Sequence, residues 1–352
     1  MIEGMRLQTR IAIVRAKGFE LFGIYTDTIE KLKRFGEVEV LYGSDDPITL
    51  ANQLLNFQIV ITEILKPKFT SEFFEKNKDV QMIFVNGRGY DNVDVKAAEE
   101  YGVLVARVPG WCEAEAVAEH TIALLLTALR KLGKADKWVK SGEWWKKGYI
   151  SADFVTKNIK DLIIGIIGFG WIGSRTARIL KYGFSAKEIL IYDPYIPDEK
   201  AREAGFHYTN NLNYLLQESD VILIHAELTP ETYHMIGKRE FKMMKDNVII
   251  INTARGPIID TSALIESLES GKIGYVALDV VEDEPINKDH PLLKFDNVLI
   301  TPHIAYATWY AIKCMDYSVI NAIENFLKGE EVWETIVKPK NPRKTCNLLI
   351  KD

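Results

Sequence analysis

The chain has 352 residues, 47% of them hydrophobic, which is long enough for two domains with separate cores. The formal net charge is −5 and the sequence pI is about 5.8, whereas nucleic-acid-binding domains are usually basic, so we expect no nucleic-acid partner. The N-terminus carries Glu3 and no long apolar core, and the most apolar stretch, 121–129, is about half the length that spans a bilayer, so we expect no membrane association and a cytoplasmic location.

The first third of the chain alternates between two patterns. Short apolar or β-branched runs are separated by charged stretches typical of helices, such as DTIEKLKRF and SEFFEKNK. The apolar runs lie at 10–14, 38–42, 58–62, 80–85 and 103–107. This alternation predicts βαβ units and a parallel sheet.

Residues 113–140 are rich in Ala and Leu, contain no Pro, and predict one long helix or two in succession. Around 122–129 the segment is apolar on all sides, so we expect it to be buried between domains or subunits. A second alternating series follows a polar linker. Its apolar runs lie at 162–168, 188–192, 220–226, 247–252, 275–280 and 297–301. This series predicts a second doubly wound α/β unit.

The segment after Thr308 is helical and leads into a polar tail. It has no further strand partners in the second unit, so we expect it to return to the first domain and make that domain discontinuous. The predicted domains are therefore 1–112 with 308–352, and 113–307. The three cysteines, Cys112, Cys314 and Cys346, are far apart and include no CxxC pair, which suggests neither a zinc site nor a disulfide framework and fits a reducing cytosol.

A glycine motif opens the second series. Gly168, Gly170 and Gly173 form GxGxxG between an apolar run and a helical pattern, the context that the dinucleotide-binding turn requires. The helix N-terminus would bind the pyrophosphate. Asp193 lies 20 residues beyond Gly173, where a carboxylate accepts hydrogen bonds from the ribose hydroxyls and repels a 2′-phosphate. The motif therefore predicts NAD rather than NADP as the cofactor; the alternative is a tight strand–helix turn without a ligand.

Three further strand ends carry residues that suit hydride transfer to a keto acid. Arg255 can hold a carboxylate with two hydrogen bonds, and His303 can give or take a proton near neutral pH. Glu284 can orient the histidine. Each residue alone has an ordinary structural explanation, but together on a dinucleotide-binding fold they predict a catalytic set.

These segments resemble the D-isomer-specific 2-hydroxyacid dehydrogenase family. The matching stretches are GRGYDNVD (87–94), VPGWCEAEAVAEHT (108–121), GIIGFGWIG, IYDPY, LTPET (228–232), NTARGPIIDTSAL, ALDVVEDEP and TPHIA. The resemblance implies a Rossmann dinucleotide-binding domain, a flavodoxin-like substrate domain that is discontinuous, and an active site between the two. It implies that Arg255 binds the substrate carboxylate, that Glu284 pairs with the histidine, and that His303 transfers the proton. Relatives also suggest a homodimer.

The resemblance also implies the remaining cofactor and substrate contacts. Besides the glycines and Asp193, the cofactor residues would be Trp171, Ile172, Thr232, Thr253, Ala254 and Asp279, the last of which would bind the nicotinamide carboxamide. Arg88 and Gly89 fall in the substrate loop. Trp171 departs from the Arg or His that is frequent there, and Glu227 from a frequent Pro. His225 ends a strand near the adenosine side, and the histidines at 120, 207, 234 and 290 are interpreted as structural.

Several functions stay open within this resemblance. The predicted substrates are 2-keto or D-2-hydroxy acids of the glyoxylate, hydroxypyruvate, lactate or phosphoglycerate type. Formate oxidation is disfavoured because those relatives have Gln at the position of Glu284. A phosphite dehydrogenase-like enzyme and an NAD-sensing, corepressor-like binding protein are the alternatives.

Arg88 is unusual, because relatives commonly have a small or apolar residue there. If its guanidinium turns toward the substrate, it favours a substrate with a second anionic group. The alternative is that Arg88 turns away and pairs with a surface acid.

Overall fold

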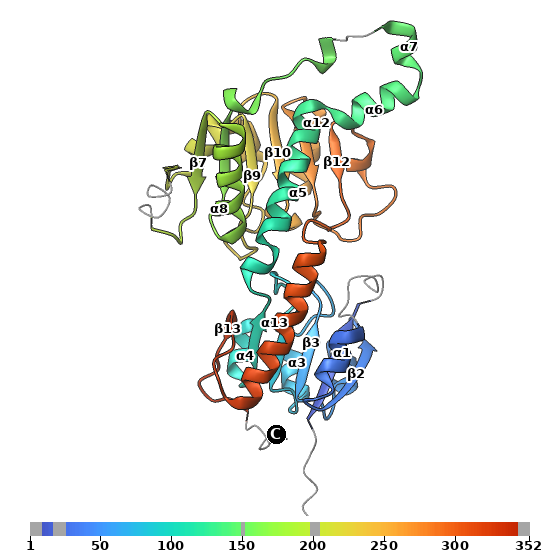
Figure 1. Cartoon of the computed structure of the whole chain (residues 1–352), viewed down its shortest axis with the longest axis vertical. Coiled ribbons are helices and arrows are strands. Elements are labelled where there is room, and N and C mark those ends of the chain that lie inside the picture. The colour runs from blue at the N-terminus through green and yellow to red at the C-terminus, as the bar shows by residue number, and fades with distance from the viewer. Residues whose placement is uncertain (1–8, 17–25, 149–151, 198–204, 344–352) are drawn as a thin grey trace, which may run out of the picture. The chain divides into compact units, whose positions relative to one another are not determined.

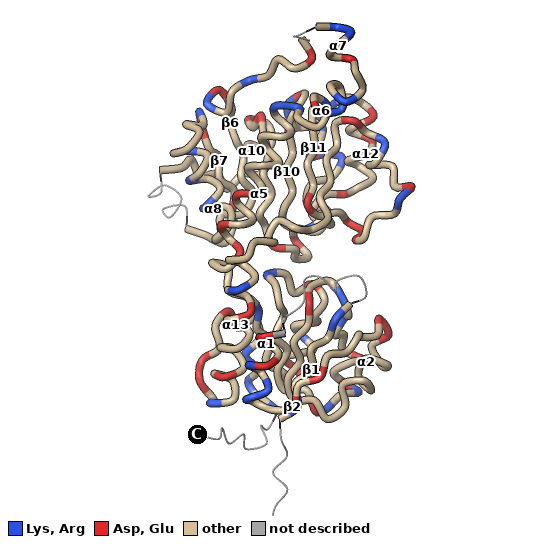
Figure 2. Tube along the Cα trace, turned by 45° about the vertical axis from the view of Figure 1, so that its right-hand side comes forward, with Lys and Arg blue, Asp and Glu red and all other residues tan. Residues whose placement is uncertain are grey.

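The computed structural model describes residues 9–16, 26–148, 152–197 and 205–343. Within these ranges the chain forms two compact units, Met1–Cys112 with Trp309–Asp352, and Glu113–Thr308. Each unit has a largely parallel sheet with helices, so the predicted fold class, two α/β domains, is confirmed (Figure 1). Basic and acidic residues are interspersed along both units (Figure 2). No helix in the described ranges is both long and apolar enough to cross a membrane.

Unit 1 is built on a six-stranded sheet. In spatial order its strands are β13 (Thr335–Val337), β5 (Leu104–Arg107), β4 (Met82–Val85), β3 (Ile59–Thr62), β1 (Arg10–Arg15) and β2 (Glu37–Tyr42). Its helices are α1 (Thr26–Leu32), α2 (Pro47–Gln53), α3 (Ser71–Lys76), α4 (Val95–Glu100) and α13 (Trp309–Lys328). The β13 strand pairs antiparallel with β5, so the C-terminal segment does return to this sheet and supplies a strand that the polar tail did not predict.

Helix starts in unit 1 follow from local side chains. Asp46 accepts a hydrogen bond from the backbone N–H of Thr49 at 2.7 Å, and Pro47 occupies the first turn of α2, where its missing N–H costs nothing. Asp94 caps α4 in the same way through the N–H of Ala97. These helices pack on a core of buried aromatic and aliphatic side chains that includes Phe69, Phe73 and Phe74.

Unit 2 is built on a seven-stranded sheet. In spatial order its strands are β12 (Val298–Ile300), β11 (Ile273–Leu278), β10 (Val248–Asn252), β9 (Val221–Ile224), β6 (Ile163–Ile167), β7 (Glu188–Tyr192) and β8 (His207–Tyr208). Its helices are α5 (Gly110–Arg130, from Glu113), α6 (Leu132–Lys140), α7 (Glu143–Lys147), α8 (Trp171–Arg178), α10 (Leu212–Glu218), α11 (Lys238–Met243) and α12 (Thr261–Glu269).

Both faces of the unit 2 sheet are covered, because successive side chains of each strand point to opposite sides. Ile164 and Ile166 of β6 pack in one core cluster with side chains of α5 and α8, while Ile167 packs in a second cluster with α10, α11 and α12. One face of the apolar stretch 122–129 of α5 thus packs in the core of unit 2, and its burial between domains or subunits stays a prediction.

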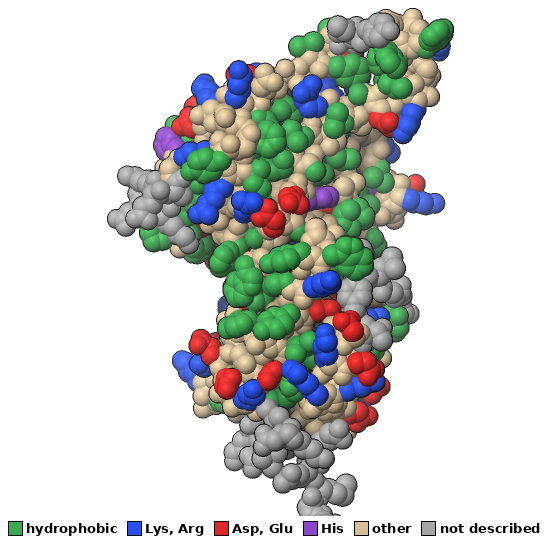
Figure 3. Space-filling model, in the orientation of Figure 1, with side chains coloured by type: hydrophobic (Ala, Val, Ile, Leu, Met, Phe, Trp, Pro, Cys, Tyr) green, Lys and Arg blue, Asp and Glu red, His purple; other side chains and the backbone are tan. Residues whose placement is uncertain are grey.

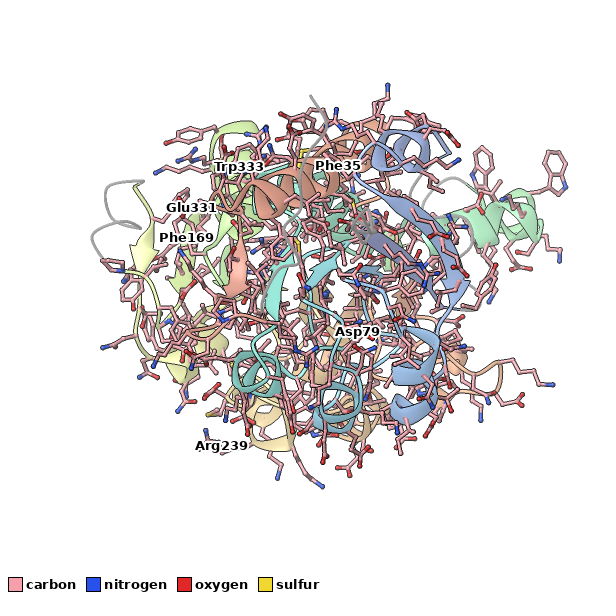
Figure 4. All side chains as sticks on the ribbon, turned by 90° about the horizontal axis from the view of Figure 1, so that it is seen from below. Phe35, Asp79, Phe169, Arg239, Glu331 and Trp333 are labelled. Carbon is pink, nitrogen blue, oxygen red and sulfur yellow. A yellow bond between two sulfur atoms is a disulfide. The ribbon has the colours of Figure 1, made fainter. Side chains whose placement is uncertain are left out.

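The predicted helical segment 113–140 is two helices in succession, α5 and α6, which is one of the two alternatives considered, because Lys131 adopts a left-handed conformation with φ of 52°. Cys112 and Cys314 form a disulfide within unit 1, so the expectation of no disulfide is wrong. The two cysteines are 202 residues apart in sequence, and only the return of α13 to unit 1 brings them together. Nearby, Trp333, labelled in Figure 4, packs edge-on against Trp111. Cys346 lies outside the described residues.

Candidate active site

The register of the unit 2 sheet brings six strand ends into one row. The terminal residues pair across the sheet in the order Ile300, Leu278, Asn252, Ile224, Ile167 and Tyr192. The residues that follow them are Thr301, Asp279, Thr253, His225, Gly168 and Asp193. Because ligands of open α/β sheets bind beyond the carboxyl ends of the strands, this row is the candidate site.

The three glycines of the motif differ in how closely other atoms approach them. Gly168 has φ of +92°, and a Cβ there would lie 2.7 Å from the backbone of His225 and Ala226. A Cβ on Gly173 would lie 2.0 Å from the carbonyl oxygen of Gly168, so α8 approaches β6 closely. A Cβ on Gly170 meets nothing within 4 Å, so this protein's own packing does not require that glycine. Open space at Gly170, at the start of α8, suits a phosphate that approaches the backbone.

Asp193 connects the end of β7 to the glycine turn. One carboxylate oxygen accepts a hydrogen bond from the N–H of Phe169 at 2.8 Å, and the other accepts one from the N–H of Tyr195 at 2.9 Å. An ionised carboxylate oxygen has more than one acceptor site, so both oxygens can still accept from a ribose diol. The acid therefore shapes the turn as well as offering a ribose contact.

His303 and Glu284 are in direct contact. His303 Nδ1 lies 2.7 Å from Glu284 Oε2, and both side chains are mostly buried. The other oxygen of Glu284 accepts a hydrogen bond from the N–H of Val281 at 3.1 Å, which fixes the carboxylate. With Glu284 on Nδ1, the Nε2 atom of His303 is the ring nitrogen for which no hydrogen bond is found within the described ranges.

The turn that carries His303 is held by Asp279. His303 itself has a left-handed backbone with φ of 54°, and its N–H donates to the carbonyl oxygen of Asp279 at 2.9 Å. The buried Asp279 carboxylate accepts hydrogen bonds from the N–H groups of Ile304 and Ala305 at 3.0 and 2.8 Å. Burial raises the pKa of Asp279, but the contact with His120, the hydrogen bond from Thr301 and these two backbone hydrogen bonds together hold it below its usual range.

Asp279 also has a partner that was interpreted as structural. His120, on α5, lies with its Nε2 3.1 Å from Thr301 Oγ1 and 3.4 Å from Asp279 Oδ1. The PHIA turn therefore rests on Asp279, Thr301 and His120. The sequence carried a signal for this role, since His120 falls within the matching stretch 108–121, but its distance of more than 150 residues from Asp279 concealed the contact. The nicotinamide contact of Asp279 stays a prediction.

Arg255 lies on the turn after β10. The buried side chain of Asn252 donates to the Arg255 carbonyl oxygen and accepts from the N–H of Ala254, both at 2.9 Å. Thr253 Oγ1 lies 2.9 Å from Thr121 Oγ1 on α5. Asn252, which was not predicted as a site residue, thus fixes the backbone from which the Arg255 guanidinium extends. The final residue of an apolar run gave no indication of this role.

The Arg255 turn and the Glu284 turn touch through their backbones. A Cβ on Gly256 would lie 2.0 Å from the carbonyl carbon and oxygen of Val281 and 2.4 Å from the N–H nitrogen of Glu282. Only a glycine permits this approach. The two turns that carry predicted catalytic side chains therefore form one packed unit.

His225 and Thr232 lie at the adenosine half of the row. Burial lowers the pKa of His225 to about 3, so the ring is neutral near neutral pH, and its Nε2 has no hydrogen-bond partner. Thr232 Oγ1 donates to the Glu227 carbonyl oxygen at 2.6 Å and accepts from the N–H of Thr229 at 2.8 Å, which closes the loop 227–232. Trp171 is half exposed on the first turn of α8, next to Ile172.

Arg88 and Gly89 belong to unit 1. One guanidinium nitrogen of Arg88 donates to Glu334 at 2.9 Å and to the Val108 carbonyl oxygen at 3.1 Å. Arg88 is thus paired with an acid, the alternative considered for it. Arg107 lies 3.6 Å from the same Glu334 carboxylate and donates to the Arg88 carbonyl oxygen at 3.0 Å.

The donor set of unit 2 fits a dinucleotide. The open face of Gly170, the helix start of α8 and the Asp193 carboxylate match phosphate and ribose chemistry. The unpartnered Nε2 of His225 marks a further buried polar atom in the same row. Within the described residues no group of three or more His, Cys, Asp or Glu side chains could hold a metal ion.

Known proteins of one kind share this sequence and fold. The family model described as "D-isomer specific 2-hydroxyacid dehydrogenase, NAD binding domain" matches residues 122–305. A glyoxylate reductase of Thermococcus litoralis is 37% identical over 86% of this chain and 91% of its own length. A D-3-phosphoglycerate dehydrogenase of Methanocaldococcus jannaschii is also 37% identical, over 93% of this chain.

Solved structures agree. A D-lactate dehydrogenase of Aquifex aeolicus, complexed with NAD and lactic acid, superimposes with a TM-score of 0.82 at 30% identity, over 94% of this chain and all of that one. The chain spans only about 60% of the length of the phosphoglycerate dehydrogenases that it matches.

Proposed function

The chain belongs to the D-isomer-specific 2-hydroxyacid dehydrogenase family, and from that premise we propose that it is an NAD-dependent oxidoreductase that interconverts a 2-keto acid and a D-2-hydroxy acid. The contact of 2.7 Å between His303 Nδ1 and Glu284 Oε2, at the end of the row of strand ends, carries this proposal. It couples an imidazole to a carboxylate on the same edge of the sheet as a turn that suits a dinucleotide.

Each residue of the set has one task. Bound NADH supplies the hydride that reduces the keto carbon. Arg255 would hold the substrate carboxylate with two parallel hydrogen bonds. His303 would donate the Nε2 proton to the carbonyl oxygen as it becomes a hydroxyl, and Glu284 on Nδ1 fixes the ring and stabilises the charged imidazolium. In the oxidation direction the same nitrogen accepts the hydroxyl proton.

Asp193 supports NAD as the preferred cofactor. Its carboxylate is held beside the glycine turn by the N–H groups of Phe169 and Tyr195, so a 2′-phosphate would meet a fixed negative charge. In the same proposal Asp279 positions the His303 turn and contacts the carboxamide, and Trp171, Ile172, Thr232, Thr253 and Ala254 line the dinucleotide. Gly89 and Arg88 shape the substrate loop of unit 1.

Loss of NADH absorbance with a panel of keto acids tests the activity. The panel contains glyoxylate, hydroxypyruvate, pyruvate, phenylpyruvate and 3-phosphohydroxypyruvate, and we expect turnover of at least one. NADH binding without any turnover would support an NAD-sensing binding protein instead. Reduction of NAD by phosphite, with no keto-acid turnover, would support the phosphite-oxidising alternative.

We also propose that the chain forms a homodimer. The helices α6 and α7 project from the sheet of unit 2 and have no buried side chain (Figure 1). They and the segment after them expose large apolar side chains, visible as green patches on that projection in Figure 3. These are Leu132, Val139, Trp144, Trp145 and Val155. A second copy that covers them would remove this apolar surface from water.

Light scattering of the purified protein tests the dimer. We expect twice the 40.1 kDa mass of one chain, and a shift toward the single-chain mass in Trp145→Glu. A single-chain mass for the unaltered protein would contradict the proposal.

A cytoplasmic location remains part of the proposal. The disulfide between Cys112 and Cys314 weighs against it in a mesophile, where cytosolic thiols are kept reduced, but hyperthermophile cytosols are rich in disulfides. Mass spectrometry of cells lysed with a thiol-blocking reagent would show whether the pair is oxidised in the cell.

A further inference from the structure

The unit 1 sheet has its own row of strand ends. The register pairs Val14 with Thr62, and Thr62 with Val85. Arg15 is the last residue of β1, and Glu63 and Asn86 are the first residues after β3 and β4, so these three residues follow one another across the carboxyl edge of the sheet. This is the edge at which open parallel sheets bind ligands. None of these three residues was predicted as a site residue.

Two residues of this row are buried acceptors without partners. Glu63 is 8% exposed and Asn86 is 9% exposed. Among the residues that the structure describes, neither carboxylate oxygen of Glu63 nor Asn86 Oδ1 has a hydrogen-bond partner. Unsatisfied buried polar atoms are rare in folded proteins and destabilise them, so a ligand that donates hydrogen bonds to these oxygens would remove a real penalty.

The backbone around Glu63 is held in place independently of any ligand. Asn92 Nδ2 donates to the carbonyl oxygens of Glu63 and Pro67 at 2.9 and 3.1 Å, and the N–H of Asn86 donates to the Thr62 carbonyl oxygen at 2.7 Å. The acceptors are therefore presented by a fixed turn.

The charge state of Glu63 suits a donor ligand. Burial raises the pKa of Glu63 to about 7, against the opposing effect of Arg15 and of the Ala16 amide, which lies near but makes no hydrogen bond of normal geometry. Near neutral pH the group is an ionised acceptor in part of the molecules, and this form repels an anion. In the rest it is a neutral acid, which accepts hydrogen bonds and can also donate one.

The nearby cations of unit 1 do not reverse this preference. Arg88 donates to Glu334 at 2.9 Å, and Arg107 lies 3.6 Å from the same carboxylate. Their positive charge is thus partly compensated within the protein, and that of Arg15 is opposed by the neighbouring Glu63, whereas Glu63 and Asn86 offer unsatisfied oxygens.

On the basis of the proposed function, we propose that Glu63 and Asn86 form a hydrogen-bond-accepting subsite that selects keto acids with a hydroxyl group beyond the keto carbon and discriminates against phosphorylated ones. A hydroxyl donates to these oxygens, whereas an ionised phosphate brings only acceptors and repels the carboxylate. The subsite would therefore favour a substrate of the hydroxypyruvate type over one of the phosphoglycerate type.

The test compares kcat/KM for hydroxypyruvate, pyruvate and 3-phosphohydroxypyruvate in four proteins: wild type, Glu63→Leu, Glu63→Gln and Glu75→Gln. Wild type should prefer hydroxypyruvate. Glu63→Leu should lose roughly tenfold or more for hydroxypyruvate and little for pyruvate, because only hydroxypyruvate uses the acceptor. Glu63→Gln should gain for the phosphorylated substrate, because it removes the charge and adds a donor. Glu75 is an exposed acid on α3 of the same unit, and its change should alter no ratio.

A binding readout separates this subsite from the proposed function. With NADH present, D-glycerate should raise the unfolding temperature of wild type more than D-lactate does, and Asn86→Leu should remove that difference even if Glu63→Leu does not fold. Equal effects of Glu63→Gln on all three substrates, or a wild-type preference for the phosphorylated one, would overturn the subsite while leaving the dehydrogenase intact. Absence of turnover with every keto acid would overturn the proposed function, and the ligand-dependent shift would still test the subsite.

Discussion

At the scale of single residues, the proposed mechanism depends most directly on His303, the proposed proton-transfer residue. Its Nδ1 is held by Glu284, so its Nε2 is the atom available for proton transfer. We expect His303→Ala to lower kcat by about 10²–10⁴-fold, which is the usual contribution of a general acid–base group, while the Kd for NADH changes little. Stopped-flow binding and steady-state turnover measure the two quantities. His207→Ala, an exposed histidine at β8, is the control, and near-wild-type turnover of His303→Ala would refute the role.

In the proposed function, Asp193 sets the cofactor preference through a charge that the structure fixes in place. Asp193→Ala should raise the KM for NADH roughly tenfold, the size expected for a lost charge-assisted hydrogen bond, and narrow the preference over NADPH. Because Asp193 also accepts from Phe169 and Tyr195, a modest fall in unfolding temperature should accompany the change. The control is Glu188→Ala, at the opposite end of β7, which should not change the preference for NADH over NADPH. An unchanged preference in Asp193→Ala would argue against the ribose contact.

Glu63 predicts a pH dependence of stability. Its pKa is about 7 in the folded chain and about 4.5 when unfolded, so between these values the folded state binds the proton more tightly. The free energy of unfolding must then fall as pH rises through this window, by about 3 kcal/mol at most. Asp316 and His225 titrate in overlapping ranges, so the measurement is the difference between wild type and Glu63→Gln in urea unfolding from pH 4.5 to 8. Parallel profiles would show that Glu63 is not buried as described.

At the scale of elements, the positions of most strands were predictable, but a short C-terminal strand and the break between two helices were not. The β-branched runs placed eleven strands to within a few residues, because buried parallel strands need continuous apolar sequence. The strand β13 was missed, since three residues pair with a partner more than two hundred positions away. The break between α5 and α6 was left open, because a lysine in a left-handed conformation carries no sequence signal.

The same distinction applies to the site. The spacing of a short motif indicated Gly168 and Asp193, whereas His303 was indicated by its place after an apolar run and by the family resemblance. Asn252 and Glu63 did not stand out, because an amide or an acid at a strand end is ordinary until the packing around it is known. His120 supports Asp279 only through the fold.

The close contact of two site turns gives an element-scale prediction. In Gly256→Ala the new methyl group would overlap the Val281 carbonyl. This overlap would push the Arg255 turn away from the Glu284 turn. We expect a loss of about 1–3 kcal/mol in the free energy of unfolding, as for other overpacked sites, and a clear fall in kcat. Denaturant unfolding and turnover report the two effects. The control is Gly133→Ala on α6, where a Cβ meets nothing within 4 Å, and it should change neither the free energy of unfolding nor kcat. A wild-type kcat in Gly256→Ala would show that the two turns act independently.

At the scale of the whole molecule, the disulfide has a particular place in the chain. Cys112 is the last residue of unit 1 before the chain enters unit 2, and Cys314 follows shortly after its return at Trp309. The loop that the disulfide closes therefore contains all of unit 2. Neither the spacing of the three cysteines nor a local motif could have indicated this pair, because only the discontinuous topology brings the two cysteines together.

This loop predicts a stabilisation through the unfolded chain. Closing about 200 residues removes unfolded-state entropy worth about 5 kcal/mol on the loop-closure model. We expect the Cys112→Ala/Cys314→Ala double variant to unfold several degrees below wild type in calorimetry, and a reductant to lower the wild-type transition to that level while leaving the variant unchanged. Neither cysteine lies in the row of strand ends in unit 2, so kcat at moderate temperature should be retained. If the reductant shifts the unfolding transitions of both proteins equally, or of neither, the disulfide does not stabilise the fold.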